Sequence, residues 1–371
     1  MKANVIKMIP LGVLAFGILS LQNCKKDAEL SENPVQENNA LATAKTSVSM
    51  PSYVVSTVGG RNPDYNFPKG DYPYNICSDA DGVMYVTSPD INTIYKVTAQ
   101  GSYTFFLNYE HPYGIKAGAN GSVYFISSHP DYGTGNSSEV IVKADKNKKT
   151  TILPVTEPLS GVRDLAIGPD SSIYIPDPSN NRIIKRTKAG VTSILAGKKG
   201  TWGDKDGLGE QARFNNPGFV KFGADGNLWV VDDLRNFVTG IPSSIRKISM
   251  KGQVTTFFKW KNDVNDSIPD THIICFAVTK RDKNFKLTPY ENVILFVSTD
   301  RYKESYQLFH LSYDKVLTPL TGNLAIPVHE QYKDGPALQA TFEAPRGLTV
   351  NPNGIFVAEA ISGAIRKIAR H

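Results

Sequence analysis

Two tyrosines and two arginines stand at equivalent positions of a spaced pattern in this chain of 371 residues. Tyr74, Tyr113 and Arg346 each follow a proline that lies nine residues before a turn glycine, and Arg163 occupies the corresponding place in another segment. Tyrosine rings offer stacking faces, and guanidinium groups offer planar donor forks for a carboxylate, a sulfate or a sugar hydroxyl. If the elements that carry these residues surround one channel, their side chains converge at its mouth.

The predicted ligand-binding set adds two polar residues that adjoin these four. Its members are Tyr74, Asn75, Tyr113, Arg163, Asp164 and Arg346. A second interpretation makes the arginines structural, because each could pair with a neighbouring carboxylate, such as Asp164, in the polar packing of the channel. The sequence leaves both interpretations open.

Oxygen-bearing residues at the ends of the aromatic strands raise a metal hypothesis. They are Ser88, Ser127, Asp177, Asp232, Thr299 and Glu359. Calcium binds oxygen ligands of this kind, but short aspartate side chains also accept hydrogen bonds in turns. This structural role is the favoured interpretation for Asp177 and Asp232. We therefore predict no cofactor, with a calcium ion in the central channel as the open alternative.

Histidine and cysteine spacing does not predict a metal site or a disulfide. The six histidines are His111, His129, His272, His310, His329 and His371, and only His111 and His272 fall near the mouth positions. Cys77 and Cys275 are embedded in apolar runs, which predicts buried thiols. The sequence contains no G-x-S-x-G elbow, H-E-x-x-H pair, P-loop or dinucleotide fingerprint. These observations favour a binding protein over an enzyme.

The N-terminal residues are typical of an exported lipoprotein. Residues 1–23 combine Lys2 and Lys7 with an apolar stretch too short to span a bilayer. Cys24 follows Leu21-Gln22-Asn23, which resembles a relaxed lipobox, and is the predicted lipidation site. Residues 24–50 have few large apolar side chains and are predicted to be a disordered tether. We expect a lipid anchor in the outer membrane, with the protein facing the periplasm or the cell surface.

Repeats dominate the rest of the chain. Residues 206–217 align without gaps on residues 334–345, sharing Asp, Gly, Gln, Ala, Phe and Pro, and six units with short apolar strands can be counted. The sixth unit lacks a fourth strand, and Val54–Gly60 resembles the fourth strand at Val191–Gly197. We therefore predict an all-β fold over residues 51–371, a six-bladed β-propeller closed by the N-terminal strand. An open sandwich of six hairpins would leave that strand unpaired.

Residues 206–248 and 334–368 resemble the NHL-repeat family, with the pattern D-G-x-x-x-x-A-x-F-x-x-P followed by a turn glycine, an aromatic strand and I-R-K-I. The resemblance implies a propeller. For function it implies a ligand-binding or protein-interaction module, or a metal-dependent lyase or lactonase. The propeller lyases carry metal-binding histidines at the mouth positions, and this chain does not.

Possible partners follow from charge and from loop lengths. The net charge of +6 is not gathered on a groove-binding element, so nucleic acid is not expected. Insertions at residues 233–244 and 281–291 are candidate partner-contacting loops. We expect a small molecule, a glycan or an envelope protein as partner, bound at the channel mouth or at these loops.

Overall fold

Six antiparallel sheets make up the part of the chain that the computed structural model describes, residues 53–59, 72–128, 139–232, 243–260, 272–284, 286–299, 305–323 and 333–370. Each sheet is one blade of a β-propeller, as predicted from the repeats. Cys24, the tether, His129, His329, His371 and most of the first candidate loop (residues 233–242) lie outside the described residues.

The strands of each blade follow one another from the channel outward. Blade 1 contains β2 (Asn75–Ser78), β3 (Met84–Ser88), β4 (Thr93–Val97) and β5 (Tyr103–Asn108). Blade 2 contains β6 (Pro112–Ala117), β7 (Val123–Ser128), β8 (Glu139–Ala144) and β9 (Thr150–Leu153). Blade 3 contains β10 (Ala166–Ile167), β11 (Ile173–Asp177), β12 (Arg182–Arg186) and β13 (Thr192–Gly197).

The second half of the ring has two blades with an added outer strand. Blade 4 contains β15 (Pro217–Phe222), β16 (Leu228–Asp232), β17 (Ser244–Ile248), β18 (Gln253–Lys259) and the short β14 (Gly207–Leu208). Blade 5 contains β19 (His272–Arg281), β20 (Leu287–Thr299), β21 (Ser305–Leu311) and β22 (Leu317–Gly322). Blade 6 contains β24 (Pro345–Asn351), β25 (Gly354–Glu359), β26 (Ala364–Arg370), β1 (Tyr53–Gly59) and the short β23 (Gly335–Pro336).

The helices among the described residues are single 3-10 turns, so none of them could span a bilayer. They are η1 (Pro89–Ile91), η2 (Ala119–Gly121), η3 (Pro178–Asn180), η4 (Gly209–Gln211) and η5 (Ala337–Gln339). Many hairpin turns begin with an aspartate that accepts backbone amides two and four residues ahead, as Asp79 does from Asp81 and Val83. This is the turn chemistry that the Asp-rich and Gly-rich segments of the sequence predict.

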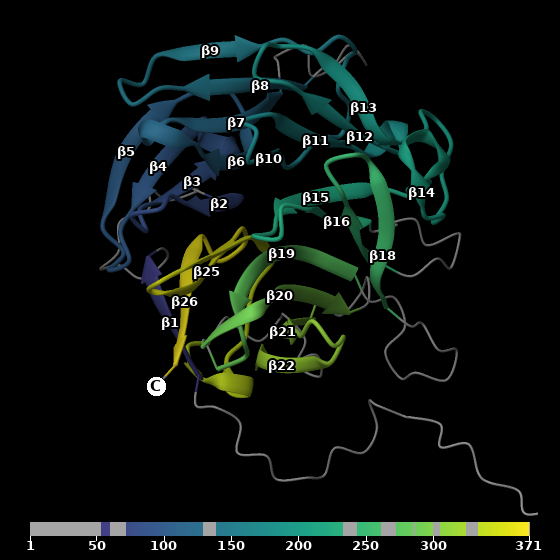
Figure 1. Ribbon diagram of the computed structural model, residues 1–371. Helices are drawn as coiled ribbons and strands as arrows, with labels where there is room; N and C mark the ends of the chain where they lie inside the picture. The colour runs from purple at the N-terminus through teal and green to yellow at the C-terminus, as the bar shows by residue number, and fades with distance from the viewer. Residues whose placement is uncertain are drawn as a thin grey trace, which may run out of the picture. The chain divides into compact units, whose positions relative to one another are not determined.

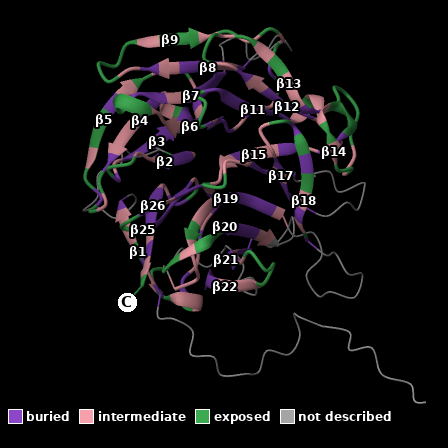
Figure 2. Cartoon of the chain, in the orientation of Figure 1, coloured by how far each residue is buried: buried purple, intermediate pink, exposed green. Residues whose placement is uncertain are grey.

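The core consists of apolar layers between neighbouring blades. Among the described residues there are six such clusters, one for each pair of adjacent blades, including the pair formed by blades 6 and 1. They arise because successive side chains of a strand point to opposite faces, and each middle strand packs against a neighbour on both faces. Figure 2 shows these middle strands buried, whereas β5 and β9 at the periphery carry exposed residues.

The N-terminal strand closes the ring. β1 pairs antiparallel with β26 from Tyr53 opposite Arg370 to Thr57 opposite Arg366, and Figure 1 shows the purple β1 beside the yellow β26. The prediction that this strand completes the sixth blade is therefore confirmed. Since the two strands come from opposite ends of the sequence, their pairing leaves no open edge at the seam.

A buried arginine cross-links the connector, the strands and the turn in blade 4. Arg246 lies between Asp206 (2.7 Å) and Asp232 (3.3 Å), with its guanidinium carbon 5.2 Å from the Phe214 ring centroid. Arg366 repeats the arrangement in blade 6 with Asp334 (2.8 Å), Glu359 (3.3 Å) and the Phe342 ring (5.2 Å). We call these clusters the arginine locks. The aspartates and phenylalanines shared by the two repeats are therefore residues that build these locks.

Candidate functional site

All six inner strands line a central cavity of about 280 Å³. In each blade, the residue four positions after the one that opens the blade, just before the mouth position, lines this cavity. These residues are Cys77, Lys116, Ala166, Lys221, Ala277 and Thr349. Four of the six are small or weakly polar, so the two lysines dominate the charge of the wall. Because these positions lie three residues beyond the predicted mouth residues, they are on the order of 10 Å deeper along the strands.

Asp164 bridges the two channel lysines. Its carboxylate accepts hydrogen bonds from Lys116 Nζ at 2.9 Å and from Lys221 Nζ at 3.0 Å, and also from the backbone N–H of Val220 at 3.1 Å. Asp164 has no exposed surface, and the side chains of the lysines are 14% and 17% exposed. This channel cluster joins blades 2, 3 and 4 and contains one more positive charge than negative charge.

Burial and the mutual charges set the ionisation of this cluster. Burial opposes ionisation of Asp164, but Lys116 and Lys221 together hold its pKa below the usual value. Burial lowers the pKa of Lys221 to about 8, against the attraction of Asp164 and with the help of repulsion from Lys116. The cavity wall is therefore cationic at neutral pH and loses positive charge as the pH rises through about 8.

Three of the predicted mouth residues form a row across blades 1, 2 and 3. The Tyr74 and Tyr113 rings meet edge to face, with centroids 5.2 Å apart and planes at 76°. The guanidinium carbon of Arg163 lies 4.3 Å from the Tyr113 ring centroid, a cation–π contact. Gly114 allows this approach, because a Cβ there would come within 2.6 Å of the Asp164 Cα. The structure thus brings Tyr74, Tyr113 and Arg163 together.

The other predicted residues are placed differently. Asn75 is buried, and its side-chain oxygen accepts the Ile76 amide at 2.8 Å, so it supports the start of β2. Asp164 belongs to the channel cluster, and no ion pair joins it to Arg163 among the described residues. Neither Arg163 nor Arg346 forms an ion pair within the described residues. Within the described part of the chain, no ion pair or cation–π contact joins Arg346 to the Tyr74–Tyr113–Arg163 row.

The acidic residues at the strand ends serve the fold. Asp232 accepts the backbone amides of Asn215 (2.9 Å) and Asn216 (2.8 Å), and Asp177 accepts the Arg182 Nε–H at 2.8 Å. The structural interpretation of Asp177 and Asp232 is confirmed. Within the described ranges no three His, Cys, Asp or Glu side chains converge as metal ligands.

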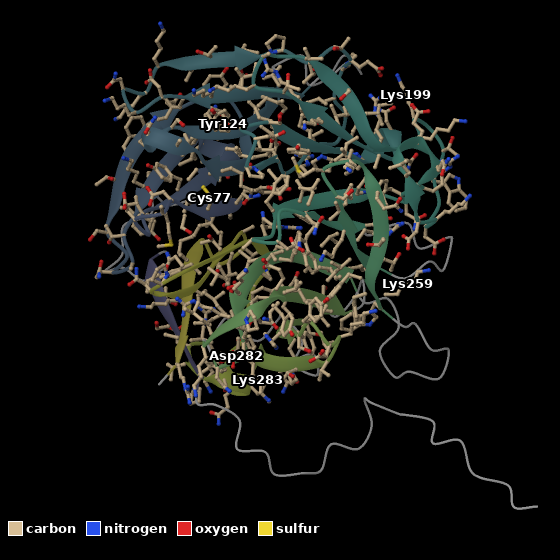
Figure 3. All side chains as sticks on the ribbon, in the orientation of Figure 1. Cys77, Tyr124, Lys199, Lys259, Asp282 and Lys283 are labelled. Carbon is tan, nitrogen blue, oxygen red and sulfur yellow. The ribbon has the colours of Figure 1, made fainter. Side chains whose placement is uncertain are left out.

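The cysteines and histidines bear on redox and metal chemistry. Cys77 and Cys275 are free and buried, and burial raises the pKa of each thiol to about 12. The prediction of buried thiols is confirmed, and such thiols are poor nucleophiles. His111 and His272 are half-buried at the ends of blades 2 and 5. Figure 3 shows Cys77 on the inner side of blade 1.

The two channel lysines were not predicted from the sequence, although a usable signal existed. Lys116 and Lys221 each follow a blade-opening proline by four residues, the same frame that singled out Tyr113. Scanning every offset of that frame for charge would have found them. What the frame could not show is that Asp164, from a blade without this proline, lies between them.

Comparison with known proteins supports the fold and no particular activity. No family model matches the chain, and no curated protein sequence is similar to it. Among solved structures, an auxiliary nutrient binding protein from Bacteroides ovatus has a TM-score of 0.61 at 12% identity, covering 86% of this chain and 77% of its own. A protein of unknown function from Bacteroides thetaiotaomicron has a TM-score of 0.56 at 17% identity, covering 86% and 76%.

An enzyme shares the same fold. Virginiamycin B lyase from Staphylococcus aureus has a TM-score of 0.51 at 15% identity, covering 86% of this chain and 100% of its own. Binding proteins and lyases are therefore both found among the propellers that this chain resembles. At these identities the likeness shows the propeller alone, and the NHL-repeat resemblance stays a prediction.

Proposed function

We propose that this chain is a non-catalytic binding module of the cell envelope that takes a small anionic molecule or an acidic sugar at the channel mouth. One observation carries the proposal. Arg163, held on the Tyr113 ring at 4.3 Å, has no carboxylate within ion-pair distance among the described residues, although the charge of Glu139 acts on it from farther away, and it stands above a channel whose wall carries an excess positive charge.

The chemistry of the row favours a planar anion. A guanidinium presents paired donors to a carboxylate or a sulfate, and the adjacent Tyr74 and Tyr113 rings can cover an apolar part of the ligand. Arg346, from blade 6, is a second guanidinium at the equivalent position. Asn75 and Asp164 would support the site from below. In this arrangement Lys116 and Lys221 attract the anion without touching it.

Isothermal titration of the purified protein with aliphatic carboxylates, sulfate and acidic sugars tests this proposal. We expect binding of at least one of these anions to fall tenfold or more in Arg163→Gln. Arg213→Gln is the matched control, because the Arg213 guanidinium contacts backbone carbonyls of a connector at 2.5 and 2.7 Å. Equal affinities of the wild-type and Arg163→Gln proteins would overturn the mouth assignment.

Elemental analysis and melting curves of the same purified protein address the metal-dependent enzyme as the alternative. A stoichiometric calcium or zinc ion, detected by elemental analysis and raising the melting temperature, would favour a propeller lyase or lactonase over a binding module. His111 and His272 would then be the first histidines to substitute.

The membrane attachment is a separate part of the proposal. We propose that Cys24 carries the lipid and that residues 24–50 tether the propeller to the outer membrane. Metabolic labelling with an alkyne fatty acid should mark the wild-type protein and leave Cys24→Ala unlabelled. Labelling of both proteins would contradict this assignment.

A further inference from the structure

Blade 5 differs from the other blades at the end opposite to the channel mouth. Its first two strands contain 10 and 13 residues, whereas β2 and β3 contain 4 and 5. The second candidate loop is therefore a continuation of the β19–β20 hairpin, with extended strands in place of an irregular insertion. Figure 3 shows Asp282 and Lys283, at the tip of this hairpin, near the rim of the described ring. A groove of about 350 Å³ lies along the extension.

Two exposed tyrosines form one wall of this groove. The Tyr290 and Tyr313 rings stack with centroids 4.8 Å apart and planes at 19°. They remain 56% and 46% exposed. Large aromatic rings left this open are a surface that a ligand can cover favourably. Tyr313 is held from behind by Phe257 of blade 4, with centroids 6.4 Å apart.

A buried histidine forms part of the floor. His310 is 3% exposed, and neither of its ring nitrogens has a hydrogen-bond partner among the described residues. It lies opposite Thr318 in the register of β21 and β22, and Thr318 also lines the groove. A buried polar group without a partner costs about 1–3 kcal/mol. This imidazole can donate one hydrogen bond and accept one from a bound molecule.

Amide and hydroxyl groups complete the lining. Thr288, Tyr290 and Asn292 alternate along β20 and so share one face of the strand. The Asn292 amide donates to Thr288 Oγ1 and to the Tyr290 carbonyl, each at 3.0 Å, which fixes its orientation. Asp282, Lys283 and Asp314 contribute two negative charges and one positive charge. The groove is therefore polar with a small excess of negative charge, unlike the cationic channel.

We propose that this groove is a second binding site, for a neutral saccharide. A pyranose ring has an apolar face of C–H groups that packs on an aromatic ring, and its hydroxyls both donate and accept hydrogen bonds. The stacked tyrosines match the first property, and His310, Asn292 and Thr318 match the second. An anionic ligand would gain nothing here, because the groove carries two carboxylates and one ammonium. The proposal is independent of the anion site at the channel mouth.

Affinity electrophoresis and titration with neutral hexasaccharides of glucose, xylose and mannose test the site. We expect at least one of them to bind the wild-type protein and to bind Tyr290→Ala and Tyr313→Ala at least tenfold more weakly. Phe105→Ala is the control, since Phe105 is a 58% exposed aromatic residue on β5 of blade 1. No binding of any hexasaccharide at millimolar concentration, or equal binding by wild type and Tyr290→Ala, would overturn the proposal.

His310→Leu separates a binding role from a structural one. Leucine removes both unpartnered nitrogens, so the melting temperature should stay or rise while saccharide affinity falls tenfold or more. A lowered melting temperature with unchanged affinity would mean that His310 serves the fold through a buried water, and its place in the site would be lost. Arg163→Gln should leave saccharide binding unchanged, so failure at one site is distinguishable from failure at the other.

Discussion

The arginine locks and the channel cluster are both groups of three charges around a buried central residue, and the central charges are opposite in sign. In blade 4, Arg246 lies between two carboxylates, those of Asp206 and Asp232. In the channel, Asp164 lies between two ammonium groups, those of Lys116 and Lys221. The blade 4 lock has one excess negative charge, and the channel cluster has one excess positive charge.

The hydrogen-bond partners around each group explain why the lock is structural and the channel cluster is a candidate binding site. Asp206 accepts the amide and hydroxyl of Thr256, both at 2.9 Å, and Asp232 accepts two further amides. These donors offset the excess negative charge of the lock. Lys116 and Lys221 find no acceptor other than Asp164 among the described residues, and they face the cavity. An external anion is the natural counterpart of that remaining charge.

The largest expected effect is the loss of a lock. Arg246→Met leaves the fully buried Asp232 without its cation, and removing one partner of a buried ion pair costs about 3–5 kcal/mol. Asp206 adds little to this cost, because its side chain is 45% exposed and solvent screens it. We expect the unfolding free energy from urea denaturation to fall by that amount.

Lys199→Met provides the control for this lock. Lys199 is 58% exposed and pairs with Glu157 at the surface, where an ion pair contributes less than about 1 kcal/mol. If Arg246→Met cost no more than Lys199→Met, the lock would not be the stabilising element that its repetition in blade 6 indicates.

A smaller loss is expected from breaking the channel cluster at its centre. Asp164→Asn leaves two lysines facing each other, but a buried lysine can release its proton, so the cost should be about 2–3 kcal/mol. The double variant Asp164→Asn with Lys221→Met should recover part of this cost in a denaturation experiment. A purely additive double variant would mean that the two groups do not interact.

The contrast also explains how much the sequence could predict. The locks belong to the repeat, so Asp206, Asp334 and the closing strand were visible as a shared frame, and the fold followed from it. Blade 3 opens with Val162 in place of a proline, and the position of Asp164 between lysines of blades 2 and 4 depends on ring geometry that no local pattern encodes. The groove of blade 5 lies in the least regular repeat, and Tyr290 and Tyr313 come together there because the β19–β20 hairpin is long.

A moderate effect is expected at the ring seam, where β1 holds the same place in blade 6 as β18 does in blade 4. Thr57 donates its amide (2.7 Å) and hydroxyl (3.1 Å) to Asp334, as Thr256 does to Asp206. Thr57→Ala and Thr256→Ala should therefore each cost about 0.5–1.5 kcal/mol in thermal or urea unfolding. A much larger cost for Thr57→Ala would show that the seam is weaker than the other blades and opens first.

The smallest effect at pH 7 is expected from Lys221→Met. This variant removes the excess charge of the channel cluster and keeps the Lys116–Asp164 pair. The unfolding free energy should therefore change by less than about 1 kcal/mol. Its signature is the pH dependence. Because burial lowers the pKa of Lys221 to about 8 from 10.5, the unfolded chain holds this proton between these values and the folded chain does not. The unfolding free energy of the wild type should therefore rise relative to that of Lys221→Met between pH 8 and 10.5. Anion binding at the mouth should weaken over the same range in the wild type alone. Parallel stability curves for the two proteins would show that Lys221 stays charged in the channel, held by Asp164 without any need for an anion.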